Sequence, residues 1–70
     1  MTNSVYKVIE LVGTSSESWE KAAASAISKA NETLRDIRIA EVVAMDIHVV
    51  DGKLQYRTKL KLSFKFEGHH

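Results

Sequence analysis

The sequence of 70 residues predicts an α+β domain with the element order β-α-β-β, in which a three-stranded antiparallel sheet wraps on one helix. Three observations predict this class. A short β-branched segment opens the chain, an apolar stripe at helical spacing follows, and two long alternating segments flank an Asp-Gly turn. We place the last strand between the other two, which gives the spatial order 1-3-2.

The first strand is predicted over residues 5–12, "VYKVIELV". Apolar side chains fall on both of its sides, with Val5, Ile9 and Leu11 on one and Tyr6, Val8 and Val12 on the other. A strand of this pattern is expected to be covered on both faces. Gly13 is expected to end it.

The helix is predicted to begin after "GTSS", where Thr14, Ser15 and Ser16 are candidate N-caps and Thr14 with Glu17 fits a capping box. It should run for some twenty residues, or about 30 Å. Its apolar stripe is mostly alanine, and such small side chains predict close packing against the sheet. The stripe consists of Trp19, Ala22, Ala23, Ala26, Ile27, Ala30, Leu34 and Ile37.

Residues 36–53, "DIRIAEVVAMDIHVVDGK", predict a strand of about fourteen residues, or about 46 Å. Asp51-Gly52 is the signature of a two-residue type I′ turn, which fixes the register of the hairpin with the alternating segment 53–67. The helix is expected to lie on the apolar face that the two strands share. The predicted register pairs Ile47 with Tyr56, Val43 with Leu60, Ile39 with Phe64, Glu41 with Leu62, and Asp46 with Arg57 as a cross-strand ion pair.

Such a hairpin is too long for a compact domain of this size, whose radius of gyration would be about 11 Å. A chain this short is also marginally stable alone, and it has no cysteine with which to form a disulfide. We therefore expect copies of the same chain to cover the second face of the sheet.

Composition excludes several function classes. The net charge of +1 gives little reason to expect nucleic acid or an anionic membrane as a partner, and no apolar run approaches a membrane span. No signal-peptide pattern opens the chain, so a cytoplasmic location is expected. "GHH" at residues 68–70 resembles the remnant of an affinity tag, which leaves residues 1–67 as a single domain.

The side chains carry no catalytic pattern: there is no nucleophile beside a histidine and no phosphate-binding glycine loop. We interpret Trp19 as a packing residue, and the lysine-rich side of the last strand as a solvated face. The candidate ligands for a divalent cation are Glu41, Asp46 and His48. Since a metal site needs several converging ligands, they would have to meet at a contact between copies.

The chain resembles the dodecins, small β-α-β-β proteins that assemble into a hollow shell of twelve subunits. The resemblance rests on "VYKVIELVGTSSESW", "ETLR", "AEVV", the hairpin and "LSFKFE", and it covers residues 5 to 67. It implies a non-enzymatic homododecamer that binds or stores a flavin, FMN or riboflavin, in pairs at two-fold interfaces.

The resemblance also gives the positions of the flavin site. Ile39 stands where dodecins have a tryptophan that stacks on the isoalloxazine ring, and Arg57 stands where they have a glutamine that binds the ring edge. Asp46 stands where members that hold a flavin phosphate have an arginine. Isoleucine has no π face, arginine has no acceptor, and aspartate repels a phosphate, so weak or lost flavin binding is expected.

Three functions remain open at this point: storage of a flavin or another flat ligand, a flavin-free dodecamer that binds divalent cations between subunits, and a purely structural or interaction assembly. No cofactor is assigned by the sequence alone.

Overall fold

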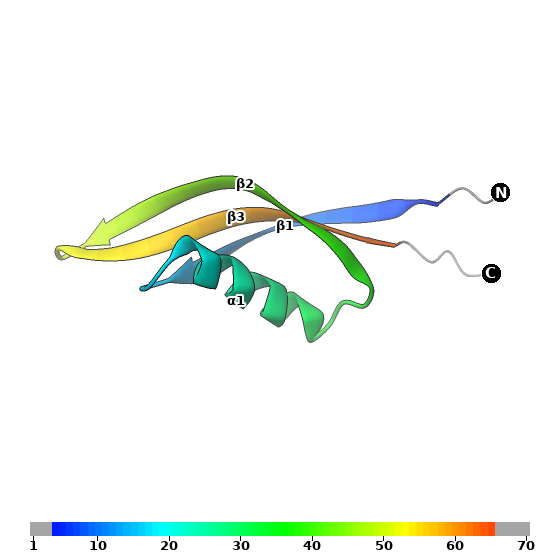
Figure 1. Cartoon of the computed structure of the whole chain (residues 1–70), viewed down its shortest axis with the longest axis horizontal. Coiled ribbons are helices and arrows are strands. Elements are labelled where there is room, and N and C mark those ends of the chain that lie inside the picture. Colours follow the sequence, from blue (N-terminus) through cyan, green and yellow to red (C-terminus); the bar gives the residue numbers. More distant parts are fainter. Residues whose placement is uncertain (1–3, 66–70) are drawn as a thin grey trace.

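The computed structural model describes residues 4–65, which form β1 (Tyr6–Ser15), α1 (Trp19–Asn31), β2 (Ile37–Val50) and β3 (Lys53–Lys65) (Figure 1). The three strands make one antiparallel sheet in the order β1-β3-β2. The predicted fold class and strand order are therefore confirmed. The proposed tag remnant at residues 68–70, and the predicted end of the last strand at 66–67, lie outside the described residues.

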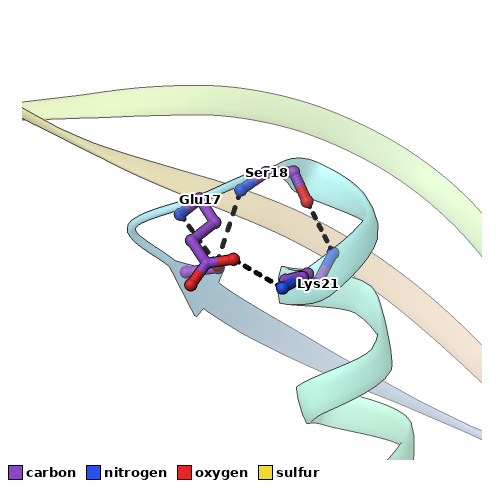
Figure 2. A network of polar contacts seen from close by, with 4 residues as sticks. Glu17, Ser18 and Lys21 are labelled. Carbon is purple, nitrogen blue, oxygen red and sulfur yellow. Dashed lines mark hydrogen bonds and ion pairs between the residues drawn. The ribbon is translucent and has the colours of Figure 1, made fainter.

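The helix begins later than predicted. The N-cap is Ser18, whose hydroxyl oxygen accepts a hydrogen bond of 3.0 Å from the backbone N–H of Lys21, and Lys21 also pairs with Glu17 (Figure 2). The Ser15 hydroxyl accepts from the backbone N–H groups of Glu17 and Ser18. The capping box at Thr14 was thus wrong, because Thr14 still belongs to β1. With 13 residues, α1 is also shorter than expected, and Leu34 and Ile37 lie beyond its end.

The core forms where α1 lies on β1 and β3. Ala22, Ala26 and Ala30 of the helix are buried, as are Leu60 and Leu62 of β3. Ile9 and Leu11 of β1 pack at the edge of this cluster. The predicted close approach is confirmed at Gly13, where an added Cβ would lie 1.9 Å from the carbonyl oxygen of Ala22. Gly13 does not end β1, as was predicted, but makes room within it for the helix.

The helix does not cover β2, which corrects the expectation that α1 lies on both long strands. Every residue of β2 after Ile37 is exposed, including Met45, Ile47 and Val49. Figure 1 shows the β2–β3 hairpin extending past the start of α1. Residues 4–65 therefore leave the apolar side chains of β2 after Ile37 largely uncovered.

The register of the hairpin is as predicted from the turn to Ala44, with Ile47 opposite Tyr56 and Asp46 opposite Arg57. Beyond that point β2 contains two bulges, between Val42 and Ala44 and between Ile37 and Ile39. The predicted pairs farther from the turn are therefore wrong. The observed pairs there are Val42–Leu60, Glu41–Lys61, Ile39–Ser63 and Ile37–Phe64.

The subunit is elongated, with extents of 54 × 21 × 14 Å and a radius of gyration of 14.6 Å. A compact chain of this length would have a radius of gyration of about 11 Å. The hairpin thus projects, as its length predicted. Residues 4–65 include no helix with the length and apolar composition needed to cross a bilayer.

Candidate functional site

The candidate residues gather on the face of the sheet that points away from α1, which we call the outer face. Thr58, Leu60 and Leu62 of β3 are buried on the helix side, so their odd-numbered neighbours lie on the outer face. The register then brings to this face the β2 residues that pair with odd-numbered β3 residues. They are Ile39, Glu41, Ala44, Asp46, His48 and Val50.

The bulge at Val43 decides which residues share this face. One extra residue in a strand shifts the pairing by one and turns the side chains that follow to the other face. Ile39 and Glu41 were predicted on the helix side, opposite Phe64 and Leu62. They instead lie on the outer face with Asp46, opposite Ser63 and Lys61.

Asp46 and Arg57 form the best-defined contact of the outer face. The Nε of Arg57 donates to one oxygen of the Asp46 carboxylate at 2.7 Å, and an Nη donates to the other at 2.8 Å. The hydrogen bond from Arg57 lowers the pKa of Asp46 below its ordinary value, and the positive charge of Arg57 adds to this effect. The same hydrogen bond raises the pKa of Arg57. The predicted cross-strand ion pair is confirmed.

His48 lies two residues from Asp46, and the same face carries both side chains. Its Nδ1 is 3.3 Å from the Oε1 of Gln55, its cross-strand partner. An imidazole in this position presents its second nitrogen to the surroundings, so His48 can serve as a donor or a ligand beside Asp46.

Glu41 lies apart from these two residues. Its partner is Lys61, four residues from Arg57 along β3, which corresponds to about 13 Å. Lys61 has Glu10 of β1 on its other side, and Glu10 forms an ion pair of 3.5 Å with Lys59. The outer face therefore alternates acidic and basic side chains.

No group of three or more His, Cys, Asp or Glu side chains within the described residues is arranged to hold a metal ion. The three predicted ligands do not converge within one chain. Asp46 and His48 lie two residues apart on the same face, whereas Glu41 lies farther along the strand. A cation site on the outer face would need ligands from a second copy of the chain, as the sequence also indicated.

The flavin positions are separated in the same way. Asp46 and Arg57 touch, but Ile39 pairs with Ser63, six residues from Arg57 along β3 or about 20 Å. One chain thus holds only part of the predicted site. A cavity of about 380 Å³ adjoins the ion pair, and its lining consists of Val12, Ala44, Asp46, Arg57 and Lys59.

Sequence reasoning missed a link between α1 and this region. The indole N–H of Trp19 donates to the main-chain oxygen of Asp46 at 3.0 Å, and the ring packs edge-on against Tyr56 with centroids 5.1 Å apart. The helical spacing of Trp19 predicted a packing residue, which is confirmed. Nothing in the spacing indicated the hydrogen bond to a strand 27 residues away.

Comparison with known proteins settles the family. The Dodecin family model matches residues 5–67 of the 70 residues. The chain belongs to the dodecin family. This dodecin is 52% identical over 63 residues to the calcium dodecin of Mycobacterium tuberculosis, a match that covers 89% of each protein.

Solved dodecin structures have the same fold. The crystal structure of the M. tuberculosis calcium dodecin, described as calcium chelating with a novel calcium-binding site, matches at 48% identity with a TM-score of 0.84, covering 94% of this chain and 96% of that one. The dodecin from Streptomyces coelicolor matches at 34% identity with a TM-score of 0.91, covering 99% of this chain and 100% of that one.

Proposed function

We propose that this dodecin is a non-enzymatic binding protein that assembles into a hollow homododecamer and binds a divalent cation, calcium in the first instance, between subunits. The observation that carries the proposal is the Asp46 carboxylate, which lies on the outer face. The family resemblance implies an arginine at this position in members that hold a flavin phosphate. The similarity of the chain to a calcium dodecin supports the same choice.

The uncovered hairpin supports assembly. Met45, Ile47, Val49 and Leu54 are each at least 40% exposed in the isolated chain, and an exposed apolar surface of this extent is typical of an interface. Contact with other copies would bury it. Multi-angle light scattering should report a mass near twelve chains, whereas a stable monomer or dimer at micromolar concentration would contradict the proposal.

Calcium prefers oxygen ligands, and carboxylates are the strongest that a protein offers. Both oxygens of Asp46 already accept hydrogen bonds from Arg57, so a cation must compete with the guanidinium for them. Glu41 has a similar basic neighbour in Lys61. The two candidate ligands can therefore be distinguished by removing their basic neighbours one at a time.

The test is calcium titration by calorimetry after treatment with a chelator. Asp46→Asn should abolish binding, and Arg57→Gln should tighten it because the carboxylate is released. Lys61→Gln removes the same charge from the same face about 13 Å away and serves as the matched control. If Lys61→Gln tightens binding and Arg57→Gln does not, Glu41 is the ligand. An affinity that none of Asp46→Asn, Glu41→Gln and His48→Gln changes would refute a site on these residues.

Flavin is the second candidate ligand, because it is the ligand that the family resemblance implies. The loss of a stacking tryptophan at Ile39 costs about 0.5–1.5 kcal/mol for each ring face, and an unpaired polar edge costs about 1–3 kcal/mol. Since about 1.4 kcal/mol is a factor of ten, several such losses place flavin binding orders of magnitude below that of a site with both residues.

Quenching of riboflavin and FMN fluorescence measures this difference. The parent should quench weakly, and Ile39→Trp combined with Arg57→Gln should restore quenching. Nanomolar binding by the parent would contradict the argument from Ile39 and Arg57, and a double variant without any gain would show that these positions are not the site.

A further inference from the structure

Trp19 makes three contacts that together fasten the start of α1 to the hairpin. Its indole N–H donates to the main-chain oxygen of Asp46 in β2 at 3.0 Å. Its own main-chain oxygen accepts a hydrogen bond of 2.9 Å from the hydroxyl of Thr58, a buried residue of β3. Its ring edge meets Tyr56 at an interplanar angle of 83°. Trp19 is the first residue of the helix, directly after the N-cap Ser18.

These contacts lie on the helix side of the sheet, directly opposite the Asp46–Arg57 pair on the outer face. Tyr56 and Thr58 flank Arg57 in β3, and their side chains lie on the helix side of the sheet. Trp19 therefore contacts the helix side of one segment of the hairpin. The outer face of the same segment carries the ion pair. Within residues 4–65, its bond to Asp46 is the one hydrogen bond that joins α1 to β2.

The bond lies close to the bulge. Ala44 pairs with Lys59 but Val42 pairs with Leu60, so Val43 is the extra residue, three positions before Asp46. The turn at Asp51-Gly52 fixes only the register between itself and the bulge. Val42, Val43 and Ala44 contain no glycine or other residue that would hold a bulge at one position.

A bulge that moved toward the turn, past Asp46, would change the face on which this residue lies. Asp46 would then pair with Tyr56, its carboxylate would turn to the helix side, and Arg57 would lose its partner. The main-chain oxygen of Asp46 would leave the indole N–H of Trp19 at the same time.

We propose that Trp19 is a positioning residue, which fixes the bulge of β2 at Val43 and so keeps Asp46 opposite Arg57 on the outer face. The inference concerns the unliganded chain, and its test uses neither cation nor flavin. It can therefore fail or hold independently of the proposed function.

The test separates the N–H from the ring. Trp19→Phe keeps an aromatic edge beside Tyr56 but lacks the donor, and replacement of Trp19 by 3-benzothienylalanine keeps the shape of the indole with sulfur in place of the N–H. Because the chain has no cysteine, a cysteine pair can be introduced at Ala44 and Lys59, which are partners in the observed register. If the bulge moved past Asp46 toward the turn, Ala44 would pair with Thr58 and this partnership would be lost. The equilibrium constant of this disulfide in a glutathione buffer then reports the register.

We expect loss of the N–H to lower that equilibrium constant about tenfold and to speed hydrogen exchange at the Arg57 Nε–H to the rate seen in Asp46→Asn. Leu62→Ala is the control, because it weakens the core without touching Trp19. An unchanged constant and exchange rate in both Trp19 replacements, or a change no greater than that of Leu62→Ala, would overturn the proposal.

Discussion

Gly13→Ala is the substitution for which the structure most clearly predicts whether stability rises or falls. Gly13 has no left-handed backbone conformation, since the positive-φ glycine of the described residues is Gly52. Replacement of such a glycine by alanine normally stabilises a protein by about 0.4–1 kcal/mol, because it restricts the unfolded chain. Backbone entropy alone therefore predicts that Gly13→Ala raises stability.

The contacts reverse this expectation. The new methyl group would lie 1.9 Å from the main-chain oxygen of Ala22 and 3.1 Å from the Cβ of Ala26, so α1 would have to move away by more than 1 Å to reach even a separation of 3.0 Å. The obstacle is backbone, which cannot rotate aside. Overpacking of this kind costs about 1–3 kcal/mol. We expect the upper end of that range and a net loss of about 2 kcal/mol.

Thermal unfolding followed by circular dichroism measures the effect at one fixed protein concentration, because the proposed assembly would make the midpoint depend on concentration. For a small domain, about 1 kcal/mol shifts the midpoint by about 4–8 °C, so Gly13→Ala should lower it by about 8–16 °C. Gly52→Ala is the control, because no atom lies within 4 Å of its new methyl group and only the φ of 74° opposes it. A variant at Gly13 as stable as the parent would refute the packing of α1 on β1.

Three further predictions concern the ion pair, the turn after α1 and the hairpin. Because the pKa of Asp46 is lowered from its ordinary value of 3.8, the stabilisation by its bond to Arg57 is complete above that value and is lost as the pH falls through the lowered one. Urea midpoints of the parent and of Asp46→Asn should therefore converge as the pH falls below 3.8, and a constant difference would contradict the pairing. Asp36 has a φ of 58°, which is left-handed backbone. Asp36→Gly should therefore be neutral or stabilising, whereas Asp36→Val should lower the melting midpoint, and equal midpoints of the two variants would argue against the left-handed turn. Leu54 is exposed and Leu62 is buried. Leu54→Ala should therefore weaken the proposed assembly, seen as a lower mass on dilution in light scattering, without unfolding the chain, whereas Leu62→Ala should cost about 2–5 kcal/mol of folding stability. The same response from both variants would contradict their different burial.

The parts of the fold that local chemistry fixes could be predicted from the sequence. Asp51-Gly52 set the register of the hairpin correctly as far as Ala44, including the Asp46–Arg57 pair. The alanine stripe correctly indicated a helix packed close to its sheet. These predictions succeeded because each depends on residues that are neighbours in the chain or across a two-residue turn.

The errors have one physical origin, which is tertiary contact that overrides local preference. Thr14 is a good N-cap by composition, but pairing with Arg57 keeps it in β1 and moves the cap to Ser18. The bulge at Val43 has no local marker, and it moved Ile39 and Glu41 to the outer face. The proposed completion of the candidate site by other copies likewise concerns contacts that one chain does not contain.

The uncovered β2 edge has a consequence for how a newly made chain reaches its final state. A long edge strand with exposed apolar side chains pairs readily with other strands, so the isolated chain is an aggregation hazard unless the proposed assembly covers this strand. Correct assembly and misassembly both begin with an encounter between two subunits. Dilution slows both processes, so the ratio of assembled to misassembled protein depends on how selectively one hairpin binds the matching surface of another copy. If the chain assembles as proposed, its refolding yield would measure the specificity of the interface rather than the stability of the isolated chain.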